Sequence, residues 1–144
     1  MNVEYRNLHP NGPLPTLKVD GPFAAVLVIE AAVVPEWQNR ASRWLVDSGC
    51  LYMMAWGQDC SSWDHSVDDA NLSAFDYGEI PDEAWVVTTW HNEEPLDEVF
   101  WFASHCAHHP TGIEIPTTLI LDIGSHDRSD AIITQFELAQ ATPY

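Results

Sequence analysis

The chain has 144 residues, of which 46 % are hydrophobic, and its formal net charge is −17. This length fits one domain that buries roughly 70 % of the surface of the unfolded chain. The hydrophobic content excludes a disordered or fibrous protein. No apolar run approaches the ~20 residues that span a bilayer, and the N-terminus lacks the features of a secretory signal, so we expect a soluble cytoplasmic protein.

The acidic residues are concentrated in a part of the sequence that has no cation. Arg43 and Arg128 bracket 84 consecutive residues without Lys or Arg, and this span holds 16 of the 22 acidic residues. Such a surface repels nucleic acid and anionic membranes, because nothing on it neutralises phosphate. It attracts a basic protein face or divalent cations, although the same charge also serves solubility alone.

In chain order, residues 1–21 hold three prolines and two glycines with little periodicity. This pattern predicts an extended N-terminal arm that packs across the domain formed by residues 22–144. Four apolar runs of strand length follow, at 23–29, 51–56, 85–90 and 117–123. The first of them is hydrophobic without interruption, which predicts a strand that is buried on both faces, as in a parallel sheet covered by helices.

A helical pattern follows each of these runs. The helices are expected from Pro35 to a stop at Gly49, over 62–75, from 95 to about 108, and over roughly 129–140. The alternation predicts an α/β class, as one three-layer α/β/α domain with a mostly parallel sheet of about four strands. Right-handed crossovers favour the flavodoxin-like strand order 2-1-3-4, which puts the strand at 85–90 inside the sheet.

Ligands of an open parallel sheet bind beyond the carboxyl ends of its strands. Asp59, His91, Glu93 and Asp122 are expected at this edge and offer ligands that suit Mg²⁺ or Mn²⁺, or an acid/base pair. Acidic loops at strand ends that bind nothing are the simpler interpretation. Cys60 precedes a helix N-terminus, so a thiolate nucleophile with His91 as its base is another candidate, but the acidic neighbours of Cys60 oppose its ionisation.

The other cysteines and several histidines are expected at the opposite edge. Cys50, Cys106 and a histidine at 105, 108 or 109 are a candidate zinc set. Helical periodicity places Cys106 on the core side of its helix, and histidines at a helix C-terminus are favoured without a metal. The odd number of cysteines without C-x-x-C spacing predicts free thiols. We therefore predict no resident cofactor, with a divalent metal at the carboxyl edge as the alternative.

Motifs for nucleotide binding and serine hydrolysis are absent from the sequence. It contains no G-x-G-x-x-G, no G-x-x-x-x-G-K-[ST] and no G-x-S-x-G. The loops after the first two predicted strands provide neither a glycine cradle nor a cation for phosphate, which argues against ordinary nucleotide binding.

Residues 62–72, which begin Ser62-Trp63-Asp64, and residues 88–103, which begin Thr88-Thr89-Trp90-His91, resemble an uncharacterised family of short bacterial proteins. The resemblance covers most of residues 20–125. That family has no assigned activity, so the resemblance implies a bacterial, cytoplasmic, stand-alone domain and no catalytic residue.

The leading hypothesis for function is a non-catalytic module that binds a more basic protein partner through residues 59–98. The alternative is a metal-dependent or acid/base hydrolase-like enzyme that uses Asp59, His91, Glu93 and Asp122. A third interpretation is a DNA mimic, which requires acids spaced like phosphates along one face. No nucleic-acid or membrane partner is expected, and the oligomeric state is left open.

Overall fold

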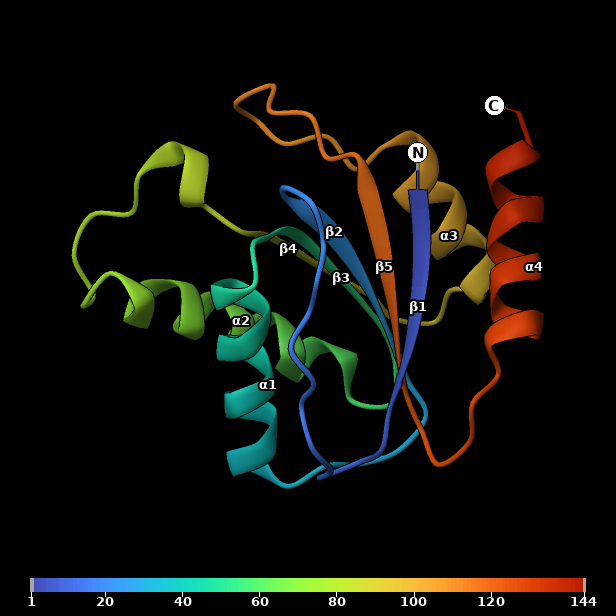
Figure 1. Cartoon of the computed structure of the whole chain (residues 1–144), viewed down its shortest axis with the longest axis horizontal. Coiled ribbons are helices and arrows are strands. Elements are labelled where there is room, and N and C mark those ends of the chain that lie inside the picture. The colour runs from blue at the N-terminus through green and yellow to red at the C-terminus, as the bar shows by residue number, and fades with distance from the viewer. Residues whose placement is uncertain (1, 144) are drawn as a thin grey trace.

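Five parallel strands form the central sheet of the computed structural model, which describes residues 2–143 (Figure 1). The strands are β1 (Asn2–Leu8), β2 (Phe23–Ile29), β3 (Cys50–Gly57), β4 (Val87–His91) and β5 (Thr117–Ile123). Their order in the sheet is β1-β5-β2-β3-β4, and each of the four neighbouring pairs is parallel. The predicted α/β class with a mostly parallel sheet is confirmed.

The predicted order 2-1-3-4 of four strands is wrong. The expected arm supplies a fifth strand, β1, and β5 lies between β1 and β2. Every residue of β5 is buried, which suits a strand with neighbours on both sides and helices on both faces. β4 contains Thr88, Thr89 and His91, and it lies at the edge of the sheet. The predicted interior position of residues 85–90 is therefore also wrong.

Helices cover both faces of the sheet. α1 (Pro35–Asp47) and α2 (Cys60–Ala74) pack on one face, whereas α3 (Leu96–His105) and α4 (Ser129–Ala141) pack on the other (Figure 1). A single 3-10 turn, η1 (Asp82–Ala84), interrupts the connector between α2 and β4.

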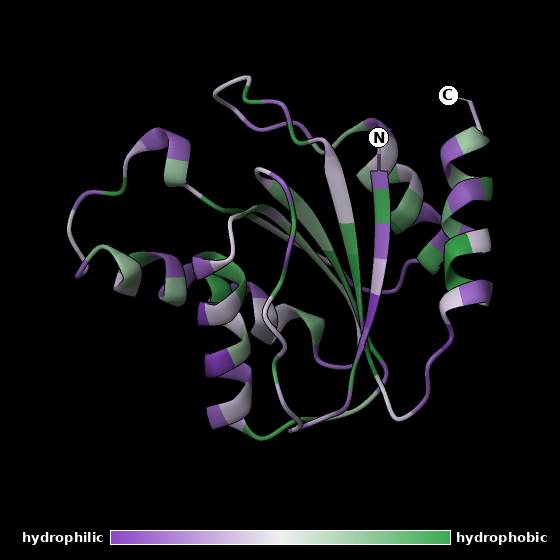
Figure 2. Cartoon of the chain, viewed as in Figure 1, coloured by the Kyte–Doolittle hydropathy of each residue, from purple (hydrophilic) through white to green (hydrophobic). Residues whose placement is uncertain are grey.

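Each face has its own apolar core, so the predicted three-layer arrangement is confirmed. Trp37 and Trp63 meet edge to face with ring centroids 6.2 Å apart in the α1–α2 core. Phe100 and Phe136 do the same at 5.3 Å in the α3–α4 core. Figure 2 shows that the most apolar segments are the interior strands, while hydrophilic residues cover the outward turns of the helices. None of the helices within residues 2–143 is long and apolar enough to cross a bilayer.

The segment between β1 and β2 crosses the α1 side of the sheet. Trp37 Nε1 donates to the carbonyl of Gly12 at 2.7 Å, and Trp44 Nε1 donates to the carbonyl of Pro15 at 2.8 Å. These bonds attach the proline-rich segment to α1. The segment thereby connects β1, which lies at the edge of the sheet next to β5, to β2 in the interior. Of the expected arm over 1–21, residues 2–21 thus consist of a strand and a tethered crossover.

Gly57 brings the end of β3 against the end of β2. Its φ is +106°, and a Cβ at this position would lie 2.3 Å from the carbonyl oxygen of Ile29. Only glycine fits, because the backbone must approach this carbonyl closely with a positive φ. The next amide, at Gln58, donates to the same carbonyl at 2.8 Å. The loop that leads to Asp59 is therefore fixed at the carboxyl edge of the sheet.

Candidate functional site

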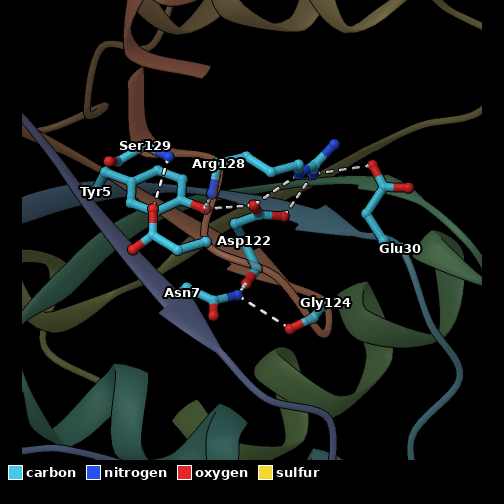
Figure 3. A network of polar contacts seen from close by, with 8 residues as sticks. Tyr5, Asn7, Glu30, Asp122, Gly124, Arg128 and Ser129 are labelled. Carbon is cyan, nitrogen blue, oxygen red and sulfur yellow. Dashed lines mark hydrogen bonds and ion pairs between the residues drawn. The ribbon is translucent and has the colours of Figure 1, made fainter. Parts of the chain in front are cut away.

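The direction of the strand order reverses between β5 and β2. From β2 the chain proceeds along the sheet to β3 and β4, and then α3 returns it to β5 on the other side of β2. The carboxyl ends of β5 and β2 are therefore where a ligand crevice is expected in such a sheet. A polar network occupies this position, with Asp122 at its centre (Figure 3).

Asp122 is fully buried and its carboxylate is paired. The Tyr5 hydroxyl donates to Oδ2 at 2.5 Å, while Arg128 donates from Nε to Oδ2 at 3.0 Å and from Nη2 to Oδ1 at 2.6 Å. Arg128 Nη2 also lies 3.1 Å from Oε1 of Glu30, which follows β2. Asn7 on β1 donates to the carbonyls of Asp122 and Gly124, at 2.9 and 3.0 Å. The network joins β1, β5, the end of β2 and the start of α4.

The charges of Asp122 and Arg128 in this network neutralise each other and are not directed at a ligand site. Burial and the hydrogen bond to Asp122 raise the pKa of Tyr5, so its phenol stays a neutral donor at physiological pH. The hydrogen bonds to Asp122 raise the pKa of Arg128 further, which keeps the guanidinium charged. A carboxylate in a bidentate pair and away from solvent is a structural ion pair rather than a poised general base.

Sequence reasoning placed Asp122 at this edge but missed its partners Tyr5 and Arg128. Two signals were available. Asp122 is the one charged residue in the apolar run 117–123, and a lone charge inside a buried strand requires a partner. Arg128 is the first cation after the 84-residue gap and lies six residues further on. Nothing local pointed to Tyr5, which is 117 residues away.

His91 forms local contacts at the end of β4. Its Nδ1 lies 3.0 Å from Glu94 Oε2, its Nε2 lies 2.9 Å from Thr89 Oγ1, and its ring centroid is 5.2 Å from that of Phe102. The carbonyl of Glu94 accepts a 2.6 Å hydrogen bond from Trp56 Nε1. His91 is thus a buried side chain that fixes the loop after β4.

The candidate residues of the carboxyl edge do not come together in one site. Asp122 and His91 are separated by β2 and β3, and three strand spacings amount to roughly 14 Å. Asp59 and Glu93 are exposed, each with a positive φ in its own loop. Cys60 is buried in the α1–α2 core. Within residues 2–143, no group of three His, Cys, Asp or Glu side chains is arranged to hold a metal ion.

At the amino edge of the sheet, Cys50 is part of the apolar core and His109 forms hydrogen bonds that connect two loops. Burial raises the pKa of Cys50 to about 12, so its thiol stays protonated in the core. His109 Nε2 lies 2.7 Å from the carbonyl oxygen of Trp85, and its Nδ1 lies 2.7 Å from Thr111 Oγ1. This histidine holds the loop after α3 against the connector that precedes β4.

A second polar region lies on α2, the connector and β4. Asn71 on α2 donates to the carbonyl of Ala84 at 3.1 Å and accepts from the amide of Val86 at 3.0 Å. Further along, the Thr88 hydroxyl donates to Asp68 at 2.8 Å. These bonds hold α2 beside the end of the connector and the start of β4. The exposed carboxylates of α2, the connector and the loop after β4 are Asp69, Asp76, Glu79, Asp82, Glu83, Glu93 and Glu94. Glu94 pairs with His91, and the other six are called the acidic surface.

The elements that carry the acidic surface contain no Lys or Arg, and the neighbouring Arg43 of α1 donates to Ser73 on α2 at 3.2 Å. None of its six exposed carboxylates forms a salt bridge in the described part of the chain. Three large aromatic side chains are exposed beside them: Tyr77, Trp85 and Trp90, at 63 %, 50 % and 51 %. The Tyr77 hydroxyl donates to Asp69 at 3.2 Å, so one of these rings is attached to the acids directly.

Two grooves flank the connector of this surface. One, of about 340 Å³, is lined by Asp82, Trp85, His109, Pro110 and Thr111. The other, of about 530 Å³, lies at the amino edge of the sheet and is mostly apolar, with Phe75 and Glu83 of the connector in its wall. Both grooves lie away from the carboxyl edge where sequence reasoning placed the site.

Residues 3–139 match the model of one protein family, described as Domain of unknown function (DUF7684), and the chain belongs to this family. Neither a curated protein nor a solved structure matches the chain. The expected resemblance to a family without an assigned activity is confirmed.

Proposed function

We propose that this member of the family is a non-catalytic binding module that takes a basic protein partner on its acidic surface. The observation that carries the proposal is the exposure of Trp85 and Trp90 near carboxylates that have no cationic partner within residues 2–143. Tryptophan is one of the residue types enriched among the energetic anchors of protein interfaces. Lys and Arg side chains stack on indole rings as well as pairing with carboxylates, so one basic partner satisfies both groups.

Crowding of like charges on α2 supports the proposal. Asp64 and Asp68 are one helical turn apart, and Asp68 contacts Thr88 on β4. Burial and the nearby charge of Asp64 raise the pKa of Asp68 above its ordinary value. This arrangement costs folding free energy at neutral pH, and such local costs are typical of functional surfaces. A cation of the partner would remove the repulsion.

The proposal places the module in a bacterial cytoplasm. Cys50, Cys60 and Cys106 are all free thiols, and free thiols suit a reducing compartment.

The test is binding of a basic probe, a short peptide in which Lys alternates with Val, followed by tryptophan fluorescence. We expect saturable binding that weakens with salt, because it is largely electrostatic. Trp90→Ala and Trp85→Ala should each weaken it by about tenfold, the usual effect of truncating an interface anchor.

A charge-matched pair of double variants separates surface from net charge. Asp69→Asn with Glu83→Gln removes two carboxylates of the acidic surface, and Asp130→Asn with Glu137→Gln removes two exposed carboxylates of α4. The first pair should raise Kd and the second should leave it unchanged. Absence of saturable binding, or an equal loss in both pairs, would refute the proposal.

A further inference from the structure

β4 presents an open edge of the sheet. It pairs with β3 alone, from Val87 opposite Tyr52 to His91 opposite Trp56. Within residues 2–143, no backbone hydrogen bond reaches its outer side from a loop or another element. An edge strand directs a row of N–H and C=O groups outward, and these groups readily pair with another strand.

The usual protections of a sheet edge are missing from β4. The strand Val-Thr-Thr-Trp-His contains no Lys, Arg, Asp, Glu or Pro, and its register with β3 shows no bulge. Natural proteins protect exposed edges with these features. The opposite edge strand, β1, has two of them in Glu4 and Arg6, which pair with each other at 3.1 Å.

The surroundings of β4 select the chemistry of an added strand. Thr88 contacts Asp68, and Trp90, two residues further on, projects on the same side of the sheet and is half exposed. Glu93 is exposed just beyond the end of the strand. A second copy of this chain is a poor partner, because pairing two β4 edges would bring two chains of net charge −17 together at their acidic surfaces.

We propose that an extended basic segment of the partner adds to the outer edge of β4 as a sixth strand. Backbone hydrogen bonds supply affinity, and side chains at alternate positions supply specificity, as in other cases of strand addition. Every second residue of the segment projects toward α2, where a Lys or Arg meets the carboxylate of Asp68 and the indole of Trp90. This inference rests on the proposed function. It adds that the bound segment of the partner is an extended strand with a cation at every second residue.

Backbone methylation of the Lys and Val peptide tests this inference directly. One version carries N-methyl groups on every Lys amide and the other carries them on every Val amide, so the charge is the same in both. Only one of the two sets of amides faces β4 in a strand. We expect one version to bind at least roughly tenfold more weakly than the parent peptide, because several backbone hydrogen bonds are lost, and the other to bind nearly as well.

Amide hydrogen exchange gives a second readout on the unmodified protein. Addition of the parent peptide should slow exchange at alternate residues of Val87–His91 and leave the amides of β1 unchanged. Equal binding of both methylated versions, with no slowing at β4, would overturn strand addition and leave the proposed function standing. Failure of the parent peptide to bind at all would overturn both. Slowed β4 amides in the protein alone, together with dimers in sedimentation, would overturn the basic partner in favour of a second copy.

Discussion

Asp122 shows how one side chain can link distant parts of the chain. It is completely buried on β5, and its two strongest partners come from β1 and from the start of α4. A buried carboxylate is costly unless it is paired and hydrogen-bonded, and here Tyr5 and Arg128 together supply three donated bonds. The residue that looked like a catalytic candidate in the sequence therefore fastens the N-terminal strand to the sheet.

Removal of Arg128 should be strongly destabilising. Arg128→Met leaves the Asp122 charge buried without its cation, which we expect to lower the free energy of unfolding by about 3–5 kcal/mol. Urea unfolding followed by tryptophan fluorescence measures the loss. Arg43→Met is the control, because Arg43 forms an exposed pair with Asp47 on α1 and its removal should cost less than about 1 kcal/mol. Equal losses in the two variants would contradict a structural role for the Asp122 network.

α2 and β4 act as one unit at the edge of the sheet. α2 runs antiparallel to β4, as the contacts Asn71–Val86 and Asp68–Thr88 show in sequence. The helix brings its acids beside an edge strand whose outer side is open. A basic strand could pair its backbone with the open edge of β4 and its cations with the carboxylates of α2. The helix alone offers no backbone groups for pairing, and the strand alone offers no carboxylates.

Neutralising Asp68 should stabilise the fold and weaken binding. Asp68→Asn keeps an acceptor for Thr88 but removes the repulsion with Asp64. The raised pKa of Asp68 means that its proton is favoured in the folded state, so its contribution is fully favourable below its ordinary pKa of 3.8 and is lost as pH rises through the folded value. At about pH 7 we therefore expect a gain of a few tenths to about 1 kcal/mol.

The gain from Asp68→Asn should vanish at about pH 3, where Asp68 is protonated in both states. Thermal melts at the two pH values check this, with the exposed Asp69→Asn as a control of equal charge change and little expected effect. A gain that persists unchanged in acid would argue against charge repulsion as its source.

For the molecule as a whole, charge of one sign dominates the surface. The net charge is −17, and only five Lys and Arg residues oppose 22 acids. Arg128 is held by Asp122 and Glu30, while Arg43 and Arg6 pair with acids of their own elements. Three of the five cations are thus paired within the fold, and among the described residues none of these pairs includes an exposed carboxylate of the acidic surface.

Salt should have opposite effects on stability and on binding. Raising NaCl from about 0.02 M to about 0.5 M screens the self-repulsion of the folded chain, so Tm should rise. Over the same range the Kd for the Lys and Val peptide should increase, since its attraction is screened as well. Calorimetry and fluorescence titration measure the two effects. If neither Tm nor Kd changes over this range of NaCl concentration, the electrostatic basis of the proposed function is refuted.

Local pattern alone determined the class of the fold and most of its elements. The largely apolar runs at 23–29 and 117–123 are the strands β2 and β5, and Pro35 begins α1, because burial on both faces and helix initiation leave short-range signatures. The concentration of acids between Arg43 and Arg128 was equally visible in the sequence.

Only the tertiary structure decided which strands are neighbours, and with that the candidate site. The order β1-β5-β2-β3-β4 depends on how crossovers pack over the whole sheet, which periodicity within a strand does not report. That order moved β4 from the interior to an open edge, separated His91 from Asp122, and brought Tyr5 to a carboxylate 117 residues away. Exposure of Trp85 and Trp90 was decided in the same way, because an indole in an apolar run is buried or exposed according to what packs beside it.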